Sequence, residues 1–86
     1  MPMNNPNNNT ADPTNADRVE RARKGLEYYK RRLLGESGPV DESTVEDVLC
    51  DLMHLSAADP EFPFQQSLDV AEINFNAESA AEAQKN

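Results

Sequence analysis

The stretch VEDVLCDLMHL, residues 45–55, is the most apolar window in an otherwise polar chain of 86 residues. Its aliphatic side chains recur every three or four residues, a spacing that gathers them on one face of an α-helix. The members of this seam are Val45, Val48, Leu49, Leu52 and Leu55, and Met53 widens it. An apolar face of this size must be buried against another one. The window therefore predicts a helix that belongs to a small helical domain.

A second apolar seam precedes this helix. Its members, again three or four residues apart, are Val19, Ala22, Leu26, Tyr29 and Leu33. Thr14 or Asn15 is the expected N-cap, and Asp17 carries the negative charge that suits a first helical turn. Gly35 has the residue type that most often ends a helix in a left-handed conformation. We therefore expect the first helix over residues 16–34.

A third seam follows the central helix. The central helix is expected to begin at Ser43, because Ser43 and Glu46 have the spacing of a capping box. It should end near residue 58, since Pro60 and Pro63 cannot continue helical hydrogen bonding. Beyond them, one helical face carries Phe64, Leu68, Ala71 and Phe75. Phe62, in the connection, is expected to pack between the helices.

Together the seams predict an all-α fold, a small three-helix bundle with helices at about 16–34, 43–58 and 64–78. The last two helices should form an antiparallel hairpin, with the first packed across them. Residues 1–15 are rich in Asn and Pro and are expected to be a disordered tail. Residues 79–86 are rich in Ala and Glu and are expected to fray. One domain, residues 16–78, remains.

Composition favours a water-soluble, cytoplasmic protein. Sixteen acidic and eight basic residues give a net charge of −8, which opposes whole-protein attraction to nucleic acid or to an anionic membrane. The one cysteine, Cys50, excludes an intrachain disulfide and suits a reducing compartment. The amino-terminal residues lack the basic and apolar segments of a signal peptide, and no apolar run approaches 18 residues. We therefore expect no membrane contact.

The basic residues are unevenly distributed. Seven of the eight lie within the first predicted helix, and they are Arg18, Arg21, Arg23, Lys24, Lys30, Arg31 and Arg32. One interpretation is a small nucleic-acid-associated regulator, in which Arg21, Lys24, Arg31 and Arg32 contact phosphate and Tyr28 stacks on a base. The other is that these side chains pair with acidic groups of the same chain. The acidic isoelectric point, about 4.4, favours the second interpretation.

The remaining carboxylates raise a further alternative, an acidic surface that mimics DNA and occupies a basic protein. The residues that would carry it are Asp47, Asp51, Glu61, Asp69, Glu72 and Glu78. An acidic helical surface that only keeps the protein soluble is the simpler explanation of the same pattern. The sequence leaves both open.

Catalytic and metal-binding chemistry has little support in the residues. Asp47, Cys50, Asp51 and His54 fall on the polar face of the central helix, but the chain has no other Cys or His to complete a tetrahedral site. One histidine also supplies too little for nucleophile and base machinery. We expect a solvated face here, with no cofactor, no metal and no enzymatic activity.

Three apolar side chains fall outside the seams and are the expected contact residues. They are Tyr28, Val70 and Ile73. Apolar groups left on a surface mark an interface with a partner. The leading hypothesis is therefore a non-enzymatic interaction or accessory protein that binds another protein or a second copy of itself.

The run from Asp47 to Glu78 resembles a pattern in small bacterial all-α proteins, many encoded by mobile elements, in which a "DLLxDLMH" helix precedes an "AlxxAxxxFxAE" helix. The matching residues are Asp47, Leu49, Asp51, Leu52, Met53, His54, Phe64, Leu68, Ala71, Phe75, Ala77 and Glu78. The resemblance covers about a third of the chain. It implies a helical hairpin and carries no activity with it.

The same run is similar to the last two helices of the all-α nucleotide pyrophosphohydrolases. Those enzymes hold magnesium with a Glu-Glu-x-x-Glu motif on one helix and a Glu-x-x-Asp pair on the next. Here the first helix offers only Glu20 and Glu27 among basic residues, and Val48 stands three positions before Asp51. Because magnesium requires such carboxylates, the similarity implies at most a degenerate member without the hydrolase activity.

Overall fold

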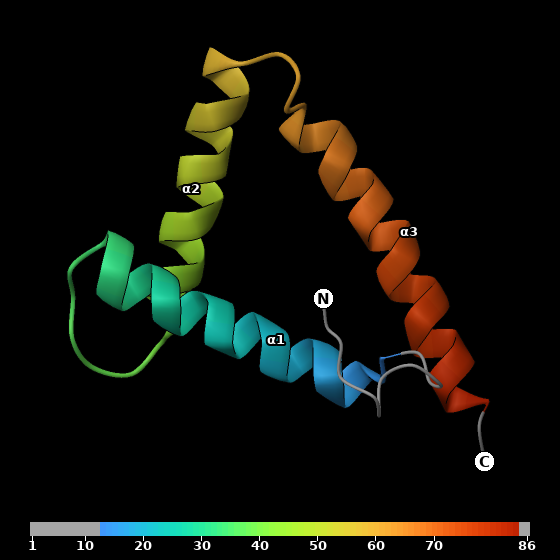
Figure 1. Ribbon diagram of the computed structural model, residues 1–86. Coiled ribbons are helices and arrows are strands. Elements are labelled where there is room, and N and C mark those ends of the chain that lie inside the picture. Colours follow the sequence, from blue (N-terminus) through green and yellow to red (C-terminus); the bar gives the residue numbers. More distant parts are fainter. Residues whose placement is uncertain (1–12, 85–86) are drawn as a thin grey trace, which may run out of the picture.

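The computed structural model describes residues 13–84 and is built of helices joined by two loops (Figure 1). The elements are α1 (Asn15–Tyr28), η2 (Tyr29–Leu33), α2 (Glu42–Ala58) and α3 (Phe64–Ala83). The described range contains no strand. The predicted all-α, three-helix fold is therefore confirmed. None of these helices combines the length and the apolar character needed to span a bilayer.

Helix α1 begins at a reciprocal cap. The Thr14 hydroxyl accepts a hydrogen bond from the Asp17 backbone N–H at 3.1 Å, and the Asp17 carboxylate accepts one from the Thr14 N–H at 2.9 Å. Two backbone donors that the first turn leaves unpaired are thereby satisfied. Thr14 is thus the N-cap, as predicted. Residues 1–12 of the predicted disordered tail lie outside the described residues.

The last turn of the first helix is a π-helix, which the sequence pattern did not predict. The Leu34 N–H donates to the Tyr29 carbonyl, five residues back, at 2.9 Å. The side chain of Lys30, only 8 % exposed, donates from Nζ to the Pro39 carbonyl at 3.0 Å. This bond ties η2 to the loop that leads into α2. Gly35 then ends the helix with a φ of 70°, as expected.

The N-cap of helix α2 lies two residues before the predicted one. The N-cap is Asp41, whose carboxylate accepts a hydrogen bond from the Thr44 N–H at 3.2 Å. Thr44 reciprocates through its hydroxyl and is 2 % exposed. The predicted cap at Ser43 is therefore wrong. An aspartate carboxylate is at least as good an acceptor as a serine hydroxyl, so the earlier position prevails.

The connection to α3 and the end of α3 also differ from expectation in part. The Phe64 N–H donates to the Ser56 hydroxyl at 3.0 Å, which satisfies a donor that the preceding proline cannot cap. Helix α3 begins at Phe64, as predicted, but continues to Ala83. The frayed tail predicted for residues 79–86 is thus helical through residue 83. Its Ala and Glu residues have high helix propensity, which explains the extension.

The three helices meet at their ends and form the sides of an open triangle (Figure 1). At one corner Arg18 Nε lies 3.3 Å from a Glu78 carboxylate oxygen, and the Asn15 N–H donates to Glu82 at 3.1 Å. The loop at residues 59–63 forms the corner between α2 and α3. Across the described residues no hydrophobic side chain is buried. The common core expected from the three seams is therefore absent within one chain, because helices in contact only at their ends leave their seams uncovered.

The α2 cap can be tested by two neighbouring substitutions. Asp41→Ala should lower the free energy of unfolding by about 1 kcal/mol, because it removes the acceptor of the Thr44 N–H. Ser43→Ala, at the position that the sequence pattern favoured, should change it by less than about 0.5 kcal/mol. Urea denaturation followed by circular dichroism measures both. A larger loss for Ser43→Ala than for Asp41→Ala would contradict the observed cap.

The α1 cap should make helix stability depend on pH. Hydrogen bonds to the Asp17 carboxylate, first from the Thr14 backbone and then from its side chain, hold the pKa of Asp17 below the ordinary 3.8. A group with a lowered folded pKa stabilises the fold above pH 3.8 and loses that contribution as the pH falls through its folded pKa. NMR titration of the Asp17 carboxyl carbon should show a midpoint below 3.8. In Thr14→Ala the midpoint should rise, and an unchanged midpoint would contradict the contribution of the hydroxyl to the lowered pKa.

Candidate interaction surface

Large apolar side chains are exposed along all three helices. Thirteen of them have between 40 and 66 % of their surface accessible, and only Lys30 and Thr44 are buried in the described range. The thirteen are Val19, Tyr28, Leu33, Val45, Leu49, Leu52, Met53, Leu55, Phe62, Leu68, Val70, Ile73 and Phe75. Single exposed apolar residues are ordinary, but contiguous ones mark interaction sites.

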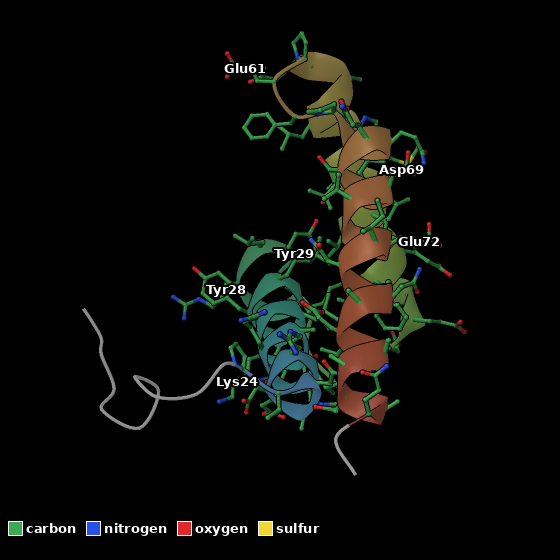
Figure 2. The ribbon with its side chains drawn as sticks, turned by 90° about the vertical axis from the view of Figure 1, so that its right-hand side faces the viewer. Lys24, Tyr28, Tyr29, Glu61, Asp69 and Glu72 are labelled. Carbon is green, nitrogen blue, oxygen red and sulfur yellow. The ribbon has the colours of Figure 1, made fainter. Side chains whose placement is uncertain are left out.

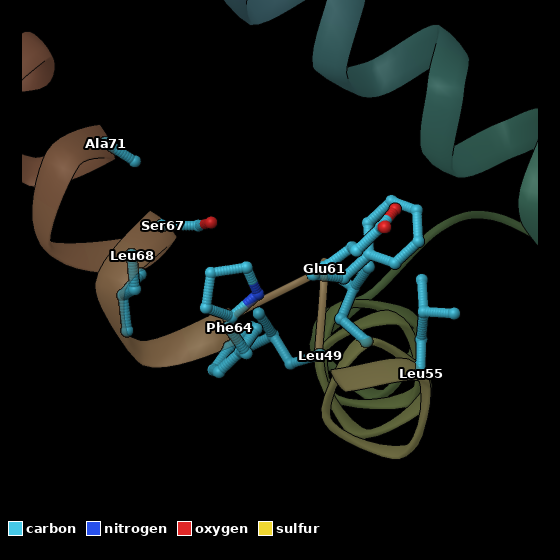
Figure 3. Close-up of a pocket in the computed structure, with 10 residues that line it drawn as sticks. Leu49, Leu55, Glu61, Phe64, Ser67, Leu68 and Ala71 are labelled. Atoms are coloured by element: carbon cyan, nitrogen blue, oxygen red, sulfur yellow. The ribbon is translucent and has the colours of Figure 1, made fainter. Parts of the chain in front are cut away.

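Part of this surface forms a groove where α2 and α3 diverge (Figure 3). We define this apolar groove by Leu49, Leu52 and Leu55 of α2 with Phe64, Leu68 and Ala71 of α3. Its volume is about 340 Å³. Next to it, Leu68, Ala71, Glu72 and Phe75 line a second hollow of about 380 Å³. The apolar surface therefore extends along α3 for three helical turns.

The rim of the groove carries its few polar groups. Glu61, in the connection between α2 and α3, and Ser67, on α3, are the polar side chains among the residues that line it (Figure 3). Phe62 also borders the groove and is 51 % exposed. It does not pack between the helices as expected, because α2 and α3 separate at the loop that carries it. The result is an apolar floor with a carboxylate at its edge.

Helix α1 cannot cover this groove in its own chain, because both of its ends are held elsewhere. Its amino-terminal end bonds to α3 near Glu78, through Arg18 and through the Asn15 amide, 3.2 Å from the Glu78 carbonyl. Its carboxyl-terminal continuation, η2, is tied to the loop before α2 by Lys30. The groove lies at the opposite corner of the triangle, beside the loop at residues 59–63.

The basic residues of α1 and η2 are mostly available to solvent. Arg18 is ion-paired and Lys30 is buried, whereas Arg21, Lys24, Arg31 and Arg32 are exposed and have no carboxylate within 4.0 Å in the described range. The predicted pairing of these four with acidic groups of the chain is therefore not observed. Together with Tyr28 we call them the basic face. Arg32 lies over the Tyr28 ring, 5.8 Å from its centroid.

Figure 2 shows how the two tyrosines diverge. Tyr28 and Lys24 point away from the other helices, and Tyr29 points toward them. The Tyr29 hydroxyl is buried and has no hydrogen-bond partner among residues 13–84. A buried hydroxyl without a partner costs about 1–3 kcal/mol. This cost is a further unfavourable contribution to folding of the single chain.

The residues predicted as an interface are exposed but do not form one patch. Val70 and Ile73 are 52 and 66 % exposed, and helical spacing places them on the side of α3 away from Leu68 and Ala71. Tyr28 belongs to α1.

The sequence pattern did not predict the apolar groove, because the leucines and the phenylalanine that line it were assigned to an internal core. The signal in the sequence that points to the groove is the small size of the seams. Their fifteen members, two of them alanines, are few for closing a core over three helices.

The other predicted sets do not converge on a site. In the described range no group of three His, Cys, Asp or Glu residues is placed to hold a metal ion, and Cys50, Asp51 and His54 are exposed. Of the six carboxylates considered as a DNA mimic, Glu78 is engaged by Arg18 and Glu61 borders the groove. Asp69 and Glu72 lie on one face of the triangle, and Lys24 and Tyr28 lie on the opposite face (Figure 2).

Comparisons with known proteins add no constraint. No family model matches the chain, and searches of curated proteins and of solved structures found no similar protein. The resemblances to mobile-element proteins and to nucleotide pyrophosphohydrolases therefore stay predictions. Inferences about function depend on the geometry of the groove and of the basic face.

Proposed function

We propose that this protein is a non-enzymatic helical interaction module, and that its apolar groove receives an amphipathic helix of a protein partner. The observation that carries this proposal is the exposure of thirteen large apolar side chains, with no hydrophobic side chain buried in the described range. Burying one such side chain fully contributes roughly 1.5–3 kcal/mol. A helix laid into a groove between two other helices recovers that free energy along the whole seam.

The composition of the groove favours a protein helix over a substrate. Small-molecule sites combine an apolar pocket with several polar groups that fix the orientation of the ligand. Here Glu61 and Ser67 are the polar lining groups, and among the described residues no group of three His, Cys, Asp or Glu is placed to hold a metal ion. The carboxylates at Glu61 and Glu72 favour a partner helix that is basic beside its apolar face, because opposite charges at a rim assist docking and orientation.

Site-specific photocross-linking tests this function in the cells that make the protein. The photoreactive residue p-benzoylphenylalanine in place of Leu52, in the groove, should form discrete cross-linked products with protein. The same residue in place of Ala57, which is exposed on another side of α2, should not. Mass spectrometry then identifies the cross-linked chain as another protein or as a second copy. Equal labelling at both positions, or none at position 52, would contradict an interaction through the groove.

A second candidate function is suggested by the basic face. Its four basic side chains are exposed without a nearby carboxylate in the described range, and Tyr28 beside Arg32 offers an aromatic surface. Such a combination suits contact with the phosphates and bases of single-stranded nucleic acid. The net charge of −8 opposes this function at long range. It therefore ranks below protein interaction.

A salt titration separates the two candidates. If four residues of the basic face contact phosphate, affinity for a single-stranded oligonucleotide should fall with a log–log slope of about −3, near −0.7 for each contact. Arg21→Gln should lower the magnitude of that slope by about one contact, whereas Arg18→Gln, which removes a side chain engaged by Glu78, should not. Fluorescence anisotropy gives both slopes. Absence of binding at low salt would eliminate this second candidate.

A further inference from the structure

We infer that the groove is occupied by the α1–η2 helix of a second copy of this chain, so that two copies exchange helices in a closed dimer. The inference rests on the proposed interaction function and names its partner. It follows from four features of the molecule: the missing core, the position of α1, the distribution of charge and the amount of exposed surface.

The first feature is that one chain lacks the layer that its seams require. Ordering each residue costs on the order of 1.5 kcal/mol, and buried apolar area is the main gain that offsets this cost. In residues 13–84 no hydrophobic side chain is buried, so a solitary chain lacks most of that gain. We therefore expect its folding to be coupled to association. A second copy is present wherever the chain is made.

The second feature is that this chain has a basic helix with exposed apolar side chains, and this helix cannot reach the groove of its own chain. The α1–η2 helix exposes Val19, Tyr28 and Leu33, each by more than half. Its ends are fixed by Arg18 at α3 and by Lys30 at the loop before α2. It therefore lies along the side of the triangle that faces the α2–α3 corner. A helix that enters the groove at that corner must therefore come from another molecule, and a second copy of this chain supplies one.

The third feature is charge. Residues 15–33 carry seven basic and three acidic side chains, a net charge of +4, whereas residues 34–84 carry twelve acidic side chains and no basic one. The groove has Glu61 at its rim, and Glu72 lines the hollow beside it. Two α2–α3 hairpins facing each other would bring like charges together. A basic helix of one copy in the acidic groove of the other brings opposite charges together instead.

The fourth feature is the exposed apolar surface. Eight of the thirteen exposed apolar residues lie on α1–η2 or on the groove and its border. Each copy presents one helix and one groove, so two copies related by a two-fold axis would satisfy both.

Complementary charge reversals test the exchange with the full chain. Arg31→Glu with Arg32→Glu reverses the basic helix, and Glu61→Arg with Glu72→Arg reverses the groove. Each double variant alone should dimerise about tenfold more weakly or worse, because like charges meet at both contacts of its homodimer. An equimolar mixture of the two should associate as well as the unmodified chain. In that heterodimer one contact is native and the other has both charges exchanged.

Sedimentation equilibrium gives the masses, and circular dichroism at the same concentrations gives the helical content. We expect a dimer whose helical content falls together with its mass on dilution. Glu46→Arg with Asp51→Arg, the same change of charge on the polar face of α2, is the matched control and should not respond to the basic-helix variant. Failure of the mixture to recover association, or an equal response from the control, would overturn the exchange.

Two further outcomes separate this inference from the proposed function. A chain that stays monomeric and unfolded at all concentrations, yet cross-links through position 52 to a different protein, overturns the second copy and retains the interaction function. A chain that is a stably helical monomer overturns the dimer. Self-cross-linking at position 52 together with the dimer mass supports both.

Discussion

The structure is governed by an imbalance between apolar seams and the surface available to cover them. Each helix carries an apolar face, but the three helices touch at their corners, so none of the faces is covered by a neighbour within the described chain. Folding free energy comes mainly from removing apolar area from water. A chain that orders its backbone without this gain can obtain it by association with another molecule. The proposed interaction function rests on this argument.

Polar contacts at the corners fix the angles between the helices, and this explains why the seams stay apart. The Arg18–Glu78 pair and the Asn15 bonds join α1 to the far end of α3. Lys30 joins η2 to the loop before α2. Such contacts contribute modestly to stability when they are exposed. Their effect here is geometric, because they hold α1 along one side of the triangle and away from the groove.

Basic and acidic side chains lie on different helices, so the exposed surfaces of the chain carry opposite charges. A groove with a carboxylate at its rim and a helix that carries the basic face belong to the same sequence. Within one chain these surfaces do not meet, so their complementarity is not used. Complementary charge mainly selects the partner and its orientation, whereas apolar burial supplies most of the affinity. Both the charge of the rim and the apolar floor of the groove suit a basic, amphipathic helix.

By itself the sequence determined the helices and most of their ends. Apolar spacing located all three, Thr14 and Gly35 marked the limits of the first, and the prolines at 60 and 63 ended the second, because these are local effects of hydrogen bonding and backbone conformation. Competition between nearby acceptors placed the cap at Asp41 instead of Ser43. Only the tertiary structure decided whether the seams close over one another. That outcome depends on the angles at two loops and on contacts between residues more than sixty positions apart, such as Asn15 with Glu82. Residue periodicity carries no information about those angles, so it could identify Leu52 and Leu68 as apolar without deciding that they would line an open groove.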